Sequence, residues 1–251
     1  MIDKIEIIVR EAGDILLSYF GKALTRNMKP DASFVTEADL ASEEYLVKKL
    51  TELLPEAAVW GEETGKHGNG DYCWVIDPLD GTTNFAQGLP HFCISVALTL
   101  KDEPILGVIY APYLNEMFIA SEDGATLNGK PIHVADKNNL RDSFLIACLP
   151  YPEYEDYGQM IEKICLLLKK GYGFRILGAA ALDIAYVACG RGDSIAFGGL
   201  KWWDVAAGKV LIEKAGGKVM DFEGGVVDKE FRTFVAGNEL LCRELLKIIE
   251  D

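Results

Sequence analysis

The feature of this sequence that most constrains its fold is a change in hydrophobic period along the chain. Up to residue 54, apolar residues recur every three or four positions, which predicts amphipathic helices over residues 2–20 and 37–54. From residue 58 to 120 they gather in short runs bounded by Pro or Gly, which predicts strands. Beyond about residue 140, such runs alternate with helical stretches. The alternation is typical of a layered α/β protein.

Further elements are expected from the same patterns. The first group of strands is expected over residues 72–76, 92–100, 105–111 and 117–120, followed by a hairpin turn at Asn128-Gly129. In the second half, the expected strands are 144–148, 174–177, 194–197, 218–221 and 233–236, and the expected helices are 153–169, 179–188, 203–215 and 239–249. The polar stretch 22–34 predicts a loop or a loose hairpin. A soft boundary near residue 140 suggests two subdomains, residues 1–140 and 141–251.

Charge and composition narrow the function classes. The 251 residues include 39 acidic and 25 basic side chains, so the net charge is −14, and a basic patch for nucleic acid is not expected. The chain begins without the apolar core of a signal peptide and holds no run of the ~20 apolar residues that a membrane span needs, which favours a cytoplasmic protein. Its six cysteines form no Cys-x-x-Cys pair and it has three histidines, so a zinc site has little support.

One stretch, Trp74 to Asn84, carries the strongest chemical signal. An apolar run leads into Asp77-Pro78, Asp80 follows three residues later, and Gly81 allows a tight turn. Two carboxylates at a strand end suit a hard divalent cation, and free backbone N–H groups at Gly81 and Thr82 would suit a phosphate if a helix starts there. Asp-Pro and Asp-Gly also mark ordinary turns, and this alternative has similar weight for the stretch in isolation.

Two further acidic sites lie far from this stretch in the sequence. Glu62 and Glu63 follow Gly61 after a short apolar run, and Asp204 precedes a helix rich in Ala and Gly. Taken alone, the glutamates fit an exposed surface pair and Asp204 fits a helix N-cap.

Together these segments resemble the inositol monophosphatase family, within the lithium-sensitive, magnesium-dependent sugar phosphatases. The resemblance rests on blocks in the family's order and spans nearly the whole chain: Val35-Thr36-Glu37-Ala38-Asp39, Gly61-Glu62-Glu63, Asp77-Pro78-Leu79-Asp80-Gly81-Thr82-Thr83-Asn84-Phe85, Trp203-Asp204-Val205-Ala206-Ala207-Gly208 and Glu213-Lys214-Ala215-Gly216-Gly217. It implies an α-β-α-β-α sandwich of helices and sheets, with the site between the two halves and a homodimer as the usual assembly.

The resemblance also implies a site with two Mg²⁺ ions and a weaker third. Glu62, Asp77 and the Leu79 carbonyl would hold the first ion, and Asp77, Asp80 and Asp204 the second. The phosphate would bridge the two ions and receive N–H bonds from Gly81 and Thr82. Asp39 and Thr82 would form a catalytic pair near the attacking, metal-activated water, with Glu62 sharing the task. Four clustered carboxylates need such cations, because they would otherwise repel one another.

Substrate choice is the least constrained expectation. Gly178 and Ala180 match the family's sugar-facing segment, with Asp80 and Asp204 beside the substrate, whereas Phe197 stands where inositol monophosphatases place an inositol-binding Glu. Lys29 would lie in the family's mobile loop. The expected reaction is hydrolysis of inositol 1-phosphate or a similar polyol or sugar phosphate, with fructose-1,6-bisphosphatase activity as the alternative. A non-catalytic partner-binding protein on the same fold is the third possibility, because some family members associate with transcription machinery.

Overall fold

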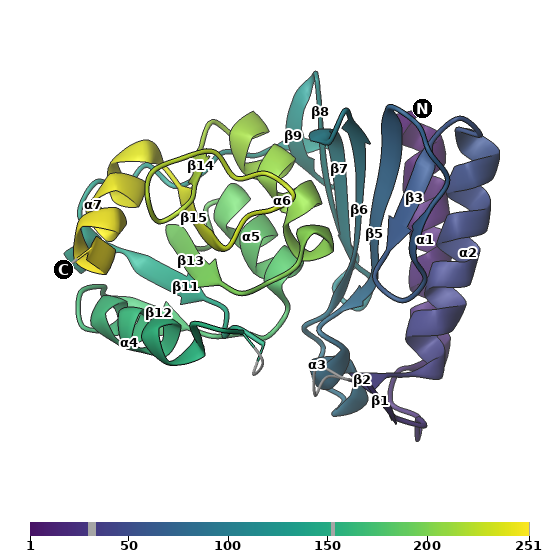
Figure 1. Cartoon of the computed structure of the whole chain (residues 1–251), viewed down its shortest axis with the longest axis horizontal. Helices are drawn as coiled ribbons and strands as arrows, with labels where there is room; N and C mark the ends of the chain where they lie inside the picture. Colours follow the sequence, from purple (N-terminus) through teal and green to yellow (C-terminus); the bar gives the residue numbers. More distant parts are fainter. Residues whose placement is uncertain (30–33, 152–153, 251) are drawn as a thin grey trace.

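The chain is built from five layers of secondary structure. The computed structural model describes residues 1–29, 34–151 and 154–250. Figure 1 shows two sheets, each with helices on both sides, so that the layers run helix, sheet, helix, sheet, helix. The α-β-α-β-α sandwich expected from the sequence is therefore confirmed. No helix among the described residues has the length and apolar character needed to cross a bilayer.

The first sheet has eight strands in the order β10-β9-β8-β7-β6-β5-β3-β4. Its strands are β3 (Ala58–Gly61), β4 (Gly65–His67), β5 (Tyr72–Asp80), β6 (Cys93–Leu100), β7 (Glu103–Ala111), β8 (Glu116–Ser121), β9 (Gly124–Leu127) and β10 (Lys130–Pro131). Helices α1 (Ile2–Tyr19) and α2 (Glu37–Leu53) cover its outer face, where their apolar stripes pack on Trp74, Ile76 and Val96. A short pair, β1 (Asn27–Met28) and β2 (Phe34–Val35), precedes α2.

The second sheet has five strands in the order β12-β11-β13-β15-β14. They are β11 (Phe144–Ala147), β12 (Gly173–Arg175), β13 (Ser194–Gly198), β14 (Lys218–Met220) and β15 (Thr233–Gly237). The helices of this half are α4 (Tyr157–Leu168), α5 (Ala180–Ala188), α6 (Trp202–Lys214) and α7 (Glu239–Glu250), with a 3₁₀ turn at Leu140–Asp142. Helices α5 and α6 lie between the sheets, and α4 and α7 cover the far face.

Most elements expected from periodicity are present, and the differences have local causes. Strand β5 continues past residue 76 to Asp80, with an irregularity in its pairing between Asp77 and Asp80. Strands β3 and β4 and the short helix α3 (Thr82–Ala86) have too few residues to show a period. The expected hairpin turn is confirmed, since Asn128 and Gly129 have φ of 49° and 75° between paired strands. The helix expected over 153–169 begins only at Tyr157, after a turn at residues 155–156, and residue 153 lies outside the described residues. The subdomain boundary near residue 140 stays a prediction.

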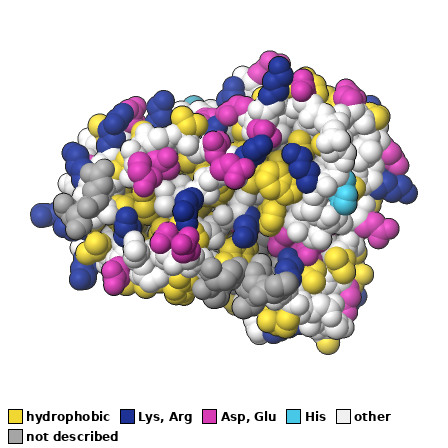
Figure 2. Space-filling view, in the orientation of Figure 1, with side chains coloured by type: hydrophobic (Ala, Val, Ile, Leu, Met, Phe, Trp, Pro, Cys, Tyr) yellow, Lys and Arg dark blue, Asp and Glu magenta, His cyan; other side chains and the backbone are white. Residues whose placement is uncertain are grey.

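Charged side chains are mixed over the surface. Figure 2 shows Lys and Arg side chains dispersed among Asp and Glu on the face in view, without one continuous basic area.

The central helix layer is packed tightly against the first sheet at Gly107. This glycine of β7 lies against α6, and a Cβ placed there would stand 2.5 Å from the Ala207 carbonyl oxygen and 2.9 Å from its Cα. A rigid helix backbone cannot move away as a flexible side chain would. Glycine at 107 therefore sets the distance between the sheet and the helix that carries Asp204.

We expect Gly107→Ala to lower the free energy of unfolding by about 1–3 kcal/mol, because it overpacks this contact. The matched control is Gly158→Ala in α4, where a Cβ meets no atom within 4 Å. The control should leave stability unchanged or raise it by up to about 1 kcal/mol. Urea titration of both variants measures the difference, and equal stability of the two would contradict the packing argument.

Candidate functional site

Two parallel strands bring the first acidic residues together. Strands β3 and β5 pair in parallel with Gly61 opposite Ile76, so Glu62 and Asp77 follow at the same edge of the sheet. The Glu62 N–H donates to the Ile76 carbonyl at 3.0 Å, which extends this register to Glu62 itself. Parallel strands place their carboxyl ends side by side, and this geometry joins sites that are 15 residues apart in the sequence.

Helix α2 fixes the backbone around Glu62. The buried Glu43 carboxylate accepts hydrogen bonds from the backbone N–H groups of Glu63 at 3.0 Å and Thr64 at 2.7 Å. A Cβ at position 61 would stand 2.5 Å from a Glu43 oxygen, which explains why a glycine precedes Glu62. The Gly-Glu-Glu segment is therefore a constrained turn and not the exposed pair considered as the alternative.

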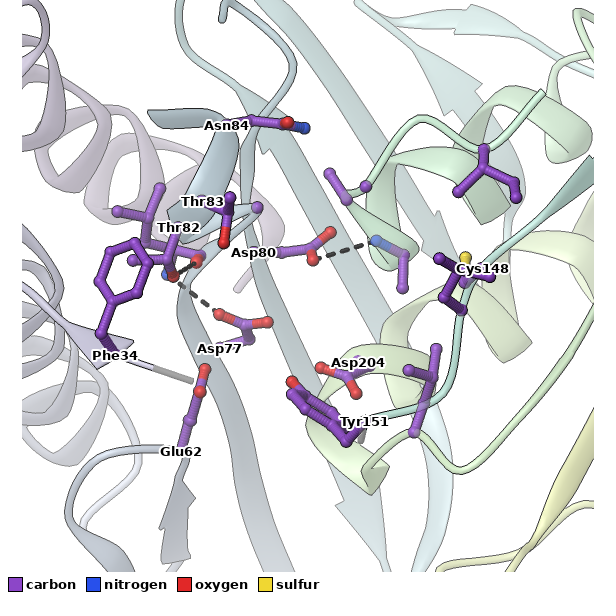
Figure 3. A pocket seen from close by; sticks show the side chains of 18 residues that line it. Phe34, Glu62, Asp77, Asp80, Thr82, Thr83, Asn84, Cys148, Tyr151 and Asp204 are labelled. Carbon is purple, nitrogen blue, oxygen red and sulfur yellow. Dashed lines mark hydrogen bonds between the residues drawn. The ribbon is translucent and has the colours of Figure 1, made fainter. Parts of the chain in front are cut away.

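Asp80 is held from the opposite half of the molecule. Its carboxylate accepts hydrogen bonds from the first backbone N–H groups of α5, from Ala180 at 3.0 Å and from Ala181 at 2.8 Å. The first N–H groups of a helix have no partner within the helix, so a carboxylate satisfies them well. Asp80 thus links the end of β5 to the central helix layer (Figure 3).

Asp204 lies on the third residue of α6. Its carboxylate reaches back to accept the Lys201 N–H at 2.7 Å. The N-cap position considered from the sequence belongs instead to Lys201, because the helix begins at Trp202. The side chain is 4% exposed and lies beside Tyr151 in Figure 3.

Asp39 and Thr82 form a direct pair. The Thr82 Oγ1 lies 3.0 Å from the Asp39 Oδ1 and also 3.0 Å from the Leu79 carbonyl oxygen. The other Asp39 oxygen accepts bonds from the Thr36 N–H at 2.9 Å and the Thr36 hydroxyl at 2.5 Å, at the start of α2. Asp39 is 1% exposed, and burial raises its pKa in spite of these three hydrogen-bond donors.

One pocket of about 330 Å³ collects the predicted metal and substrate residues. All nine of them line it: Glu62, Asp77, Leu79, Asp80, Gly81, Thr82, Gly178, Ala180 and Asp204. Asp39 lies behind Thr82 and contacts the pocket through it. The structure thus brings together every residue of the expected site. The role of each residue belongs to the proposed function below.

Negative charge gathers in the pocket. Burial, and then repulsion from the neighbouring carboxylates, raises the pKa values of Asp77 and Asp204 well above their usual range. Burial and repulsion from Asp183 raise the pKa of Asp80 to about 6, although backbone N–H groups oppose the shift. A cation would remove this repulsion, and carboxylate and carbonyl oxygens are the ligands that Mg²⁺ prefers. Among the described residues, no three His, Cys, Asp or Glu side chains already converge on one point.

A lysine occupies part of the acidic rim. The Lys29 ammonium lies 2.7 Å from Glu62 Oε1 and 2.6 Å from Glu63 Oε1. Burial, and then repulsion from Glu62, raises the pKa of Glu63 to about 7, although the Lys29 ammonium opposes the shift. The lysine of the expected mobile loop therefore contacts the site, next to residues 30–33, which lie outside the described part of the chain.

Phe197, which was expected to stand at the position of an inositol-binding Glu, lies in the hydrophobic core. Its ring is fully buried and stacks on Phe234 with 4.6 Å between centroids. It is absent from the pocket lining, so it does not fill the place of a substrate-binding Glu. A phenyl ring at this position turns into the core between the sheets, where it gains apolar burial.

Other residues join the two halves beside the pocket. The His91 ring bonds to the buried Asp183 of α5 at 2.8 Å, so His91 has a structural partner here. The Asn84 amide donates to the carbonyls of His91 at 2.9 Å and Leu177 at 2.8 Å.

Sequence reasoning missed one side of the pocket. Six residues on that side come from outside the recognised blocks: Phe34, Cys148, Leu149, Tyr151, Ile176 and Leu200. Five of them follow β11, β12 or β13, which are parallel neighbours, and Phe34 comes from β2. The rule that ligands meet the carboxyl ends of parallel strands was the signal that could have found them.

The fold and this pocket define a class of protein: a five-layered sandwich with a carboxylate-lined site between its halves. Comparison with known proteins gives the family. The sequence pattern of the Inositol monophosphatase family matches residues 2–250, and the chain belongs to that family.

Individual relatives agree. The chain is 39% identical to the Nus factor SuhB of Xylella fastidiosa, over 96% of this chain and 90% of that protein. It is 37% identical to the inositol monophosphatase of Dictyostelium discoideum, over 96% and 92% of the two chains. The crystal structure of the extragenic suppressor protein SuhB from Bartonella henselae superposes with a TM-score of 0.94 at 31% identity, covering 100% of this chain and 98% of the other. Family membership supports a phosphatase and a metal-dependent site.

We expect Asp204→Asn to raise the free energy of unfolding of the metal-free protein by about 1–3 kcal/mol at pH 8. The amide keeps an acceptor for the Lys201 N–H and removes a repelled charge. A carboxyl whose pKa is raised on folding does not lower the free energy of unfolding below its unfolded pKa, near 4. It lowers that free energy most above its folded pKa. The extra free energy of unfolding of Asp204→Asn, relative to the wild type, should therefore shrink as the pH falls from 8 to 5.

Urea titration in the presence of a chelator measures this effect. The control is Glu239→Gln in the first turn of α7, where Arg243 lowers the pKa of the carboxyl. That variant should lose stability or keep it. A loss of stability at pH 8 in Asp204→Asn would refute the repulsion argument.

Proposed function

We propose that this protein is a Mg²⁺-dependent phosphomonoesterase. The observation that carries the proposal is the pocket itself, where four carboxylates with raised pKa values lie in one cavity with Thr82, the partner of Asp39. Three of these carboxylates are buried, and Glu62 is partly exposed. Buried carboxylates that repel one another are costly without a counter-charge, and a metal site provides one. Family membership adds support for the same class of reaction.

The proposed ligands divide into two overlapping sets. Glu62, Asp77 and the Leu79 carbonyl would hold one Mg²⁺, and Asp77, Asp80 and Asp204 would hold a second. A weaker third ion near Glu62 belongs to the same proposal. When bound, these ions supply charge neutralisation for the phosphate and make a ligand water more acidic.

The chain itself would bind and orient the phosphate. Gly81 has φ of 87° and begins the turn into α3, so the first N–H groups of that helix, at Gly81 and Thr82, can face the phosphate oxygens. A Cβ at 81 would lie only 3.0 Å from the Ala179 Cβ and the His91 carbonyl oxygen, and the positive φ would strain any other residue. The close approach of the two halves therefore depends on this glycine.

Thr82 and Asp39 would place the attacking water. When the Thr82 hydroxyl donates to Asp39, its oxygen lone pairs remain free to accept a hydrogen bond from water. The water oxygen forms the new bond to phosphorus, the ester P–O bond breaks, and the leaving alcohol takes up a proton. In-line positioning of this kind supplies much of the catalysis in phosphoryl transfer. Glu62 lies on the same side and would share the orientation of the water.

The proposed substrate is inositol 1-phosphate or a similar polyol or sugar phosphate, with Gly178 and Ala180 beside the sugar. Support comes from the family and from the relative named inositol monophosphatase. Fructose 1,6-bisphosphate is the alternative, for which Lys201 near the pocket, with its ammonium 5.8 Å from the Tyr151 ring centroid, offers a cation for a second phosphate. A homodimer and lithium sensitivity remain predictions.

A second candidate function is partner binding without catalysis. The observation that favours it is the 39% identical relative named Nus factor SuhB. A fold does not decide between these functions, because the same scaffold can serve both. The intact pocket favours catalysis.

We expect purified protein to release phosphate from inositol 1-phosphate or fructose 1,6-bisphosphate only with Mg²⁺, and Asp77→Asn to lose at least about 1,000-fold in kcat/KM. Asp77 belongs to both proposed ligand sets, and metal charge stabilisation supplies several kcal/mol. The matched control is Asp123→Asn, in the turn after β8 and outside the pocket lining. Calorimetry should show Mg²⁺ binding to the wild type and its loss in Asp77→Asn. A folded wild type that binds Mg²⁺ and hydrolyses neither ester would favour the partner-binding candidate.

Thr82 gives a separate test of the catalytic pair. We expect Thr82→Val to lower kcat by about 10²–10⁴-fold, because the variant lacks the hydroxyl that orients the water. The change in KM should be small, because valine has nearly the same volume as threonine. Thr82→Ser keeps the hydroxyl and should retain activity within about tenfold of the wild type. Equal losses in the two variants would show that the hydroxyl is not the functional group.

A further inference from the structure

A second cleft lies beside the carboxylate pocket. Its volume is about 370 Å³, which is within the usual size range of small-molecule sites. Leu200 lines both the cleft and the carboxylate pocket, so the two are neighbours. Among the described residues that line the cleft, none is a proposed metal ligand, although Trp203 directly precedes Asp204. The cleft therefore presents a chemistry of its own.

The lining of this cleft is rich in aromatic rings. Three of the four tryptophans of the chain, Trp60, Trp202 and Trp203, line it together with Phe231. Trp60 comes from β3 in the first half of the molecule, and the other three rings come from the second half. The Trp60 and Trp203 rings meet edge to face, with 6.2 Å between their centroids. We call this group of four rings the aromatic cleft, and it offers indole surface against which a planar ring can pack.

Two lysines beside the aromatic cleft form no ion pair with the described part of the chain. Lys201 lines the cleft, and the Lys66 ammonium lies 5.6 Å from the Trp60 ring centroid. Figure 2 shows hydrophobic side chains among Lys and Arg side chains near the middle of the face in view. In a protein with a net charge of −14, two such cations at one cleft favour an anionic ligand.

The other charges of the cleft are closer to balance. Lys229 lines it and pairs with Asp102 at 2.8 Å. Arg232 lines it and pairs with Glu155 at 3.1 Å, and Glu230 is a further acidic lining residue. Surface ion pairs of this kind contribute little to stability, so their cations can also turn toward a ligand at small cost. The positive character of the cleft therefore depends mainly on the two lysines without an ion pair.

We infer that the aromatic cleft is a second ligand site, which binds a small planar aromatic molecule carrying an anionic group, such as a nucleotide. The ring would pack on Trp60 and Trp203, and the anionic group would lie near Lys66 or Lys201. Aromatic and cationic side chains together are a common means of holding bases and phosphates. This ligand is distinct from the proposed substrate, whose phosphate needs the carboxylate pocket, so the inference does not depend on the phosphatase function.

Calorimetry on the full chain tests this site with two probes. Cyclic AMP joins a purine ring to a phosphodiester, and indole-3-acetate joins an indole ring to a carboxylate. Neither is a phosphate monoester, so the proposed reaction cannot consume them. A chelator in the buffer leaves the carboxylate pocket without metal charge, so that it repels both anions. We expect at least one probe to bind with a Kd below about 1 mM, and its neutral analogue, adenosine or indole-3-acetamide, to bind about tenfold more weakly.

Variants of the cleft locate the binding. Trp60→Leu should weaken binding of the probe by about tenfold, because it removes the ring contact. Lys66→Gln combined with Lys201→Gln should weaken it by about three- to tenfold, because both changes remove an attractive charge. The matched control combines Lys130→Gln with Lys218→Gln, two exposed lysines outside the cleft, and should leave the Kd within about twofold of the wild type.

Each outcome decides the inference. Binding of either probe with these losses supports the site, and the tighter probe tells whether a nucleotide or an aromatic carboxylate is the better ligand. Absence of binding for both probes would overturn it, as would equal affinity in the double lysine variant and its control. Circular dichroism checks that Trp60→Leu is folded, and unchanged affinity in the folded variant would also overturn the inference. If that variant unfolds, the lysine variants decide alone, because both lysines are exposed.

Discussion

The repulsion among four carboxylates in one pocket, three of them buried, is the constraint on which the rest of this structure depends. Burial and neighbouring negative charge raise the pKa values of Glu62, Asp77, Asp80 and Asp204, so ionising all four together opposes folding. A protein of marginal stability can keep such a group only if its scaffold holds each carboxylate firmly. The described part of the chain holds Asp77, Asp80 and Asp204 with backbone groups that cannot move independently of the fold.

Each carboxylate has its own support. Asp77 accepts from the Leu79 N–H, Asp80 from the start of α5, and Asp204 from the Lys201 N–H, while Lys29 pairs with Glu62. These supports come from both halves of the molecule, so the site exists only when the halves are packed together. The contact between Gly107 and α6 thus acts on the site as well as on stability, because it fixes the helix that carries Asp204.

Much of this arrangement could be predicted from the sequence, for reasons that differ between residues. The long helices and the strands at 93–111 follow from the period and length of their apolar patterns. The acidic blocks could be recognised because their residues and their order along the chain match those of the family. Phe197 could not be placed, because a sequence position does not say whether a side chain turns toward the pocket or the core. Three lining residues of the second half were missed for a related reason: Leu149, Ile176 and Leu200 are distant in sequence and meet only through the pairing of β11, β12 and β13.

The mixed lining of the pocket also suggests how a phosphatase site of this kind could vary its substrates without losing its chemistry. The carboxylates are fixed by strand register and by helix termini, so a change among them disturbs several contacts at once. Leu149, Ile176 and Leu200 lie on the connections after strands, where side chains can change with little effect on the core. In the proposed reaction, chemistry and substrate choice would thus reside on different parts of the fold: the end of the first sheet and the start of α6 would position the phosphate, and the loops of the second sheet line the rest of the pocket.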